Sequence, residues 1–177
     1  KTTWYMYNDY LRCGGFTYLM KLVLCVAIYP QAMPIIKNNL SEINAVNDRG
    51  STALHLACRN SNTASTLECV KLLIDANADV NIRDNDGRTA LYLASENLST
   101  TSNNDTVKLL IDANADVNIQ NNDGYTALYY ASKYNHNETI DILVKAGASI
   151  RQCLEQIDCV YLQEIADKIM YKTKRAR

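Results

Sequence analysis

The sequence predicts an all-α solenoid of stacked helix-turn-helix units with short β-hairpin-like turns. Three observations predict it: a repeated segment, a recurring glycine, and helical spacing of the apolar residues within each unit. The segment VKLLIDANADVNI at residues 70–82 recurs letter for letter at residues 107–119, and Gly50, Gly87 and Gly124 recur every 37 residues. Self-similarity at such a period is typical of architectures in which each unit packs only against its neighbours.

The first predicted helix of each unit follows the recurring glycine. The pattern T-A-L-x-x-A stands there three times, and in the second unit it places Leu91, Leu93 and Ala94 on one side of a short helix. Thr89 precedes that helix and offers a side-chain oxygen that can cap its first turn.

The second predicted helix of each unit carries an apolar stripe. Val107, Leu110 and Ile111 recur at intervals of three and four residues, and the helix is expected to end near Asn114. The counterpart of Asn114 in the last unit is Gly147. Asparagine and glycine adopt the left-handed conformation of a helix end most readily, so this exchange supports the predicted end.

The segments that join the helices differ in length and type. The last unit is 33 residues long, and the two before it carry four more in the polar tracts 60–66 and 97–105. We expect loops in these tracts, because added loop length costs little free energy. Between units, the pattern D-V-N-I-x-x-N-D-G predicts an extended arm, in which Val80 and Ile82 alternate, followed by a tight turn.

A unit of this kind, with T-A-L-H-L-A at residues 52–57 and A-D-V-N twice, resembles the ankyrin repeat. The resemblance implies an N-terminal flank at 1–11, a degenerate repeat at 12–46, and three clear repeats at 47–83, 84–120 and 121–153. Gly15, Thr17 and Leu19 fit the first helix of the degenerate repeat, and Ile35, Ile36, Ile43 and Asn44 fit its second helix. Lys21 departs from the family pattern, which has an apolar residue there.

Residues 154–177 follow the last repeat. Their apolar residues recur at three and four, which predicts a capping helix over the exposed face of that repeat; these residues are Leu154, Ile157, Tyr161, Ile165 and Ile169. A helix that docks a partner is the alternative. Lys172, Lys174, Arg175 and Arg177 form a basic tail, for which solvation is the simplest role.

Composition and motifs argue against several functions. The 18 basic and 19 acidic residues leave a net charge of −1, so the basic field that nucleic-acid binding needs is absent. The six cysteines include no C-x-x-C pair, and we expect reduced, mostly buried thiols and no metal site. The longest apolar run, residues 22–29, is too short to cross a membrane. No phosphate loop or Ser/His/Asp set is present, so we expect no enzyme and no cofactor.

The resemblance implies a protein-binding role through the concave face of the stack, most simply as a monomer. It also implies that His55 braces its repeat near Thr52 and that His136 braces a loop, rather than acting as catalysts. The family most often contacts ligands through the turn and the end of the first helix. Here those positions are Asp48, Arg49, Ser51, Arg59 and Asn60; Asn85, Asp86, Arg88, Glu96 and Asn97; and Asn122, Asp123, Tyr125, Lys133 and Tyr134. Arg49, Arg88, Tyr125 and Tyr134 are the expected anchors, because arginine and tyrosine are favoured in interfaces.

The Ser/Asn/Thr-rich extensions resemble those of ankyrin proteins of giant DNA viruses of amoebae, the mimivirus-like ones in particular. The 19 asparagines and 12 tyrosines have A/T-rich codons, which fits such a genome and equally an A/T-rich intracellular bacterium. This resemblance implies an effector in the host cytoplasm. Two alternatives are an adaptor that recruits targets to a ubiquitin ligase through residues 154–177, and an enzyme whose catalytic domain lies outside this sequence.

Overall fold

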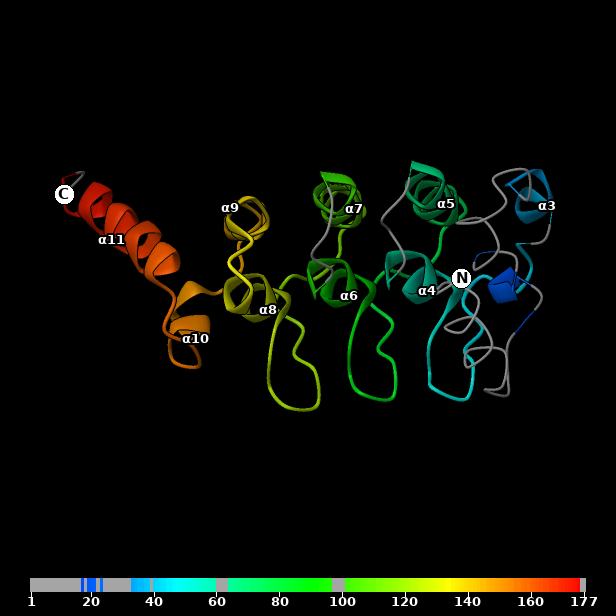
Figure 1. Cartoon of the computed structure of the whole chain (residues 1–177), viewed down its shortest axis with the longest axis horizontal. Coiled ribbons are helices and arrows are strands. Elements are labelled where there is room, and N and C mark those ends of the chain that lie inside the picture. Colours follow the sequence, from blue (N-terminus) through cyan, green and yellow to red (C-terminus); the bar gives the residue numbers. More distant parts are fainter. Residues whose placement is uncertain are drawn as a thin grey trace, which may run out of the picture.

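The computed structural model describes residues 17, 19–21, 23, 33–38, 40–59, 64–96 and 101–175. Its helices stand in two rows (Figure 1). The first row contains α4 (Ala53–Arg59), α6 (Ala90–Glu96) and α8 (Ala127–Lys133), and the second contains α3 (Met33–Lys37), α5 (Ala64–Asp75), α7 (Thr101–Asp112) and α9 (Asn137–Lys145). From α4 to α9, each helix contacts the next one in its row. The turns project from the first row, away from the second, and the described residues contain no strand. The all-α repeat fold is therefore confirmed.

Two of the first helices, α4 and α6, are buried along almost their whole length. In α6 every residue from Ala90 to Ser95 is buried, and α4 is buried from Ala53 to Cys58. Helix α6 packs between α4 and α8 with α7 behind it, and α4 packs against α6 and α5, which contributes to this burial. The threonine caps are present as predicted, since the Thr89 hydroxyl accepts the backbone N–H of Tyr92 at 3.2 Å.

The second helices end in the predicted left-handed residue. Asn77 and Asn114 both have a φ of 63°, and Gly147 has a φ of 94°. At Asn114 the chain forms a Schellman motif, in which Ala115 N–H binds the Leu110 carbonyl at 2.9 Å and Asn114 N–H binds the Ile111 carbonyl at 2.9 Å. The same pair of bonds closes α5 and α9.

The described parts of the polar tracts, residues 64–66 and 101–105, are helical, so the expectation of loops was wrong there. The second helices α5 and α7 begin at Ala64 and Thr101, several residues before the apolar stripe. In α7 a contact with the next repeat supports the added turn, since the Thr139 hydroxyl of α9 donates to Asn104 Oδ1 at 2.6 Å. Asn60 and Asn97 lie outside the described residues.

An asparagine ladder joins the ends of successive second helices. Asn44, Asn81 and Asn118 each accept a backbone N–H of the following unit through Oδ1, at 2.9, 2.8 and 2.9 Å. The prediction that Ile43 and Asn44 belong to a second helix was therefore wrong. They follow α3 in a turn, and Asn44 takes the place that Asn81 and Asn118 take in the later units.

The described part of the first unit agrees with its predicted apolar positions at Leu19 and Ile36 but not at Ile35. Leu19 and Ile36 are buried, while Lys21 is exposed, so the departure at Lys21 leaves the core intact. Ile35 is 45% exposed and lies on the outer side of α3. Gly15 and the flank 1–11 lie outside the described residues.

The C-terminal segment forms two helices, which corrects the prediction of a single capping helix from Leu154. Leu154 ends α10 (Ile150–Leu154), and α11 extends over Val160–Arg175. Gln156 Nε2 donates to the Gly124 carbonyl at 2.9 Å and so ties the break between these helices to the last turn. Helix α11 then runs obliquely to the other helices (Figure 1). The side chains of the predicted basic tail lie outside the described part of the structure.

Candidate protein-binding face

Each turn between units is closed by an aspartate or asparagine side chain at the same position of the repeat. In the second turn, Asp84 Oδ1 accepts the backbone N–H groups of Asp86 and Arg88 at 3.0 and 2.8 Å, and Asp84 N–H donates to the Arg88 carbonyl at 2.9 Å. Asn47 and Asn121 make the corresponding side-chain bonds in the other two turns. These bonds give the hairpin-like turn that the Asn-Asp-Gly pattern predicted.

Successive turns are bonded to one another. Asn85 N–H donates to the Arg49 carbonyl at 2.9 Å, and Asn122 N–H donates to the Asp86 carbonyl at 2.9 Å. The side-chain amides of Asn85 and Asn122 repeat the pattern, because each donates to a carbonyl of the preceding turn, at 2.9 and 2.8 Å. The turn tips therefore form a rigid edge along the stack.

Arg88 is held by carboxylates at the base of its turn. Its Nε donates to Asp84 Oδ2 at 3.0 Å, and a terminal nitrogen pairs with both Asp84 and Asp86. Burial lowers the pKa of the Arg88 guanidinium, but the hydrogen bond and charge of Asp84, aided by Asp86 and Glu96, outweigh this and hold the pKa above its ordinary value. Arg88 is thus positively charged and firmly positioned.

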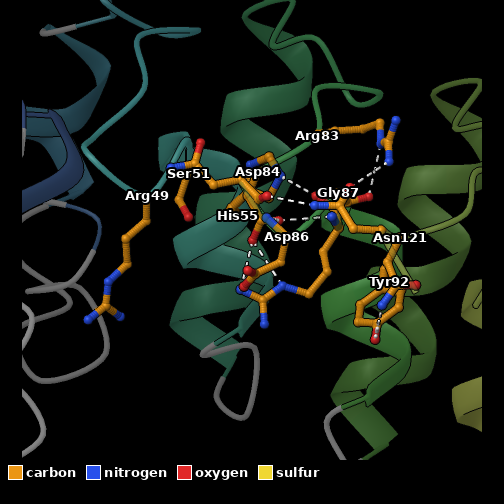
Figure 2. A network of polar contacts seen from close by, with 12 residues as sticks. Arg49, Ser51, His55, Arg83, Asp84, Asp86, Gly87, Tyr92 and Asn121 are labelled. Atoms are coloured by element: carbon orange, nitrogen blue, oxygen red, sulfur yellow. Dashed lines mark hydrogen bonds and ion pairs between the residues drawn. The ribbon is translucent and has the colours of Figure 1, made fainter. Parts of the chain in front are cut away.

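His55 bridges two units, which confirms its predicted bracing role near Thr52. Its Nδ1 lies 3.2 Å from the backbone N–H of Thr52, and its Nε2 lies 3.0 Å from the Arg88 carbonyl of the next turn. Because Nδ1 accepts from Thr52, we assign the proton to Nε2, which donates to Arg88. Burial lowers the pKa of His55, so the imidazole is neutral near pH 7. Figure 2 shows this network, in which Arg49 lies at one edge and Tyr92 and Asn121 lie at the opposite edge.

Five tyrosines gather where α8 meets α6. The rings of Tyr125 and Tyr129 stack with centroids 4.0 Å apart, and Tyr130 contacts Tyr129 and Tyr134 at 5.3 and 6.1 Å. Tyr92 of α6 lies 4.7 Å from Tyr130. The Lys133 ammonium lies over the rings of Tyr130 and Tyr134, 5.5 and 5.6 Å from their centroids. We call Tyr125, Tyr129, Tyr130, Lys133 and Tyr134 the tyrosine face.

Tyr92 anchors this face to the buried part of the stack. It is only 3% exposed, and its hydroxyl accepts Asn121 Nδ2 at 3.3 Å. Burial, followed by its hydrogen bond with Tyr130, raises the pKa of Tyr92 far above its ordinary value. The hydroxyl therefore stays protonated and serves as a fixed link between two repeats.

A family model of ankyrin repeats in three copies matches residues 22–121 and 67–153 of the chain. The chain belongs to the ankyrin repeat family. An ankyrin repeat protein of Acanthamoeba polyphaga mimivirus is 34% identical over 81 residues, which are 44% of this chain and 13% of that relative. The chain therefore matches a small part of the relative's length. Ankyrin repeats generally act as protein-protein interaction modules, and the family is typically not enzymatic.

The ankyrin stack spreads the predicted contact residues over three turns and three helix ends. Exposed side chains include Asp48, Arg49, Asn85, Asp86, Asn122, Asp123, Lys133 and Tyr134, while Arg59, Arg88, Glu96 and Tyr125 are partly exposed. Ser51 is 3% exposed and closes its turn by bonding to Asn47, so its side chain is not presented to a partner. Tyr129 and Tyr130 were missed, although their spacing of four from Tyr125 and Tyr134 could have revealed two rows of rings.

The described cysteines of this ankyrin stack are buried, and His136 is partly buried. Cys58, Cys69, Cys153 and Cys159 are free and buried, as expected, while Cys13 and Cys25 lie outside the described part. Burial lowers the pKa of His136, which precedes α9 with its ring 6.1 Å from that of Tyr134. Among the described residues no cluster of side chains could hold a metal ion. In the same part of the chain, no helix combines the length and the apolar character needed to cross a membrane.

Proposed function

We propose that this chain binds a protein partner through the tyrosine face and the adjoining turn tips. One observation carries the proposal: α4 and α6 are buried along almost their whole length, whereas α8 presents half-buried and exposed rings. Tyrosine offers a large, rigid contact area at low entropic cost, and hot spots of interfaces are enriched in it. The stack holds these rings in place before binding, which reduces the cost of association.

The proposed contact surface extends along the turns from the tyrosine face. It includes Asn122 and Asp123, then Asn85, Asp86, Arg88 and Glu96, and then Asp48, Arg49 and Arg59. Arg88 contributes mainly through its free edge, because Asp84 and Asp86 already occupy part of its guanidinium. We further propose that the chain acts as a monomer on a protein of the host cytoplasm, and the likeness to a mimivirus protein supports the host-cell setting.

Capture from amoeba lysate tests this function. We expect Tyr125→Ser, Tyr130→Ser and Tyr134→Ser, combined in one variant, to abolish capture of the partner that the parent chain retains. A matched variant on the opposite row, Glu138→Ala with Lys145→Ala, should capture it normally. Circular dichroism and Tm identify any loss that comes from unfolding. Undiminished capture by a folded triple variant would show that the tyrosine face is not the binding surface.

A ligase adaptor is a second candidate, and the C-terminal helices favour it. A groove of about 460 Å³ lies between α10 and α11, and its lining includes Ile150, Leu154, Ile169 and Met170. Ile169 and Met170 are 48% and 58% exposed, which leaves apolar surface for a ligase subunit. Co-purified ligase subunits that disappear with Ile169→Ser and Met170→Ser would support the adaptor role. Their absence from the parent chain's complexes would exclude it.

A further inference from the structure

We propose that the partner of the tyrosine face presents a cationic side chain, an arginine above all, to the junction between α6 and α8. The inference rests on the proposed function, because it assumes that the face binds a protein. It adds the chemistry of the partner, which follows from the ring geometry and from the charges beside the rings.

The tyrosine face already holds a cation of its own. The Lys133 ammonium lies 5.5 Å from the centroid of the Tyr130 ring and 5.6 Å from that of Tyr134. An aromatic face carries negative partial charge and attracts cations at such distances. Lys133 is exposed and sits on a flexible stem, so its ammonium can leave the rings when another cation arrives. Lys133 thus marks the cation site and competes for it.

Carboxylates outnumber cations beside these rings. Arg88 is the positive charge at the base of the second turn, and the carboxylates of Asp84, Asp86 and Glu96 act on it. Arg88 pairs with both Asp84, whose side chain is only 1% exposed, and Asp86, whose side chain is 67% exposed. Glu96 is partly exposed at the end of α6. These three carboxylates outnumber Arg88 and Lys133 by one charge, and the exposed parts of Asp86 and Glu96 can attract a positively charged partner.

The acidic side and the aromatic side of the junction meet at Tyr92. Its ring lies 4.7 Å from that of Tyr130, and both Glu96 and Arg88 act electrostatically on its hydroxyl. A guanidinium suits this junction better than an ammonium. It is planar, so it can stack on a tyrosine ring while its N–H groups bind a carboxylate in bidentate fashion. Exposed Asp123, on the next turn, adds a further carboxylate at the edge of the face.

Short peptides test this chemistry without the natural partner. The probe is a capped peptide of alternating glycine and arginine, titrated into the full chain at low ionic strength while NMR follows the tyrosine ring resonances. Matched peptides carry lysine, neutral citrulline or glutamate in place of arginine. Two variants report on the two parts of the site: Lys133→Gln removes the internal cation, and Glu96→Gln removes a carboxylate.

We expect the arginine peptide to shift the Tyr130 and Tyr134 resonances, the lysine peptide to bind more weakly, and the other two to bind least. Lys133→Gln should raise the affinity for arginine about two- to fivefold, the factor that an exposed cation–π contact represents. Glu96→Gln should lower it about twofold or more. Equal binding of citrulline or glutamate, no shift with arginine, or weaker binding by Lys133→Gln would overturn the inference. None of these results would affect capture through the tyrosine face, which the serine variants decide independently.

Discussion

Replacing Gly87 with alanine should loosen the stack at one defined contact between turns. Gly87 has a φ of +78°, and a Cβ built there would lie 2.7 Å from the backbone nitrogen of Asn122 and 2.5 Å from its Oδ1. Gly124 occupies the same place in the next turn with a φ of +85°, but the nearest atom to its Cβ would be Gln156 Nε2, 4.0 Å away. The two glycines therefore share their backbone strain and differ in the neighbouring turn.

The expected magnitudes follow from this difference. Alanine in the left-handed region costs roughly 1–2 kcal/mol, and this cost applies to both Gly87→Ala and Gly124→Ala. Only Gly87→Ala must also displace the backbone of Asn122, because a Cβ cannot approach a backbone atom to 2.7 Å. Overpacking of this kind costs about 1–3 kcal/mol more. For a chain of 177 residues, this difference corresponds to a gap in Tm of about 3–9 °C.

Urea unfolding followed by circular dichroism measures both variants against the parent chain. We expect Gly87→Ala to lower the free energy of unfolding by more than Gly124→Ala, with similar slopes against urea. Gly50→Ala should behave like Gly87→Ala, because its Cβ would lie 2.8 Å from the backbone nitrogen of Asn85. Equal losses for Gly87→Ala and Gly124→Ala would refute the close stacking of the turns.

Three further predictions concern buried or bridging side chains. Because the pKa of His55 is held below its ordinary 6.5 in the folded chain, the unfolded chain takes up a proton first as the pH falls, and stability should decline below about pH 6.5. His55→Tyr, the residue that the next repeat carries there, should reduce this decline in urea titrations; an unchanged pH dependence would contradict the assignment. Asn81→Ala removes two hydrogen bonds to the next repeat and should lower the free energy of unfolding by about 1–2 kcal/mol in the same assay. An unchanged free energy of unfolding would contradict a stabilising role for the asparagine ladder. Burial raises the pKa of Cys69 to about 12 and that of Cys58 higher, so a thiol reagent at pH 8 should label neither until urea unfolds the chain, as peptide mass spectrometry can check.

Features that repeat along the chain could be predicted from the sequence. The helix pairs, the left-handed ends at Asn114 and Gly147, and the bridge made by His55 each follow from a local pattern that recurs or from the family it resembles. Such features depend on residues within one unit or on a neighbour at a fixed spacing. Each local preference agrees with the stack as a whole, which is why pattern and structure coincide.

Features that depend on contacts between particular repeats could not be predicted. The described part of the second polar tract is helical, and its Asn104 is held by the Thr139 hydroxyl of the neighbouring unit, a contact that no local pattern predicts. Helix α11 begins at Val160, although the apolar spacing starts at Leu154, because Gln156 ties the intervening segment to the Gly124 turn. The pairing of Arg88 with two carboxylates also depends on the folded turn, because the sequence alone suggested that this guanidinium was available to a partner.

Site-specific photo-crosslinking tests most directly whether the tyrosine face is the binding surface. A benzoylphenylalanine in place of Tyr134 would report on α8, and the same residue in place of Lys145 would report on α9 of the same repeat. We expect the probe at position 134 to crosslink a protein of amoeba lysate, and unlabelled parent chain to compete with it. The probe at position 145 should remain uncrosslinked. Crosslinking of that protein from position 145 alone would contradict the account and place the partner on the second row of helices.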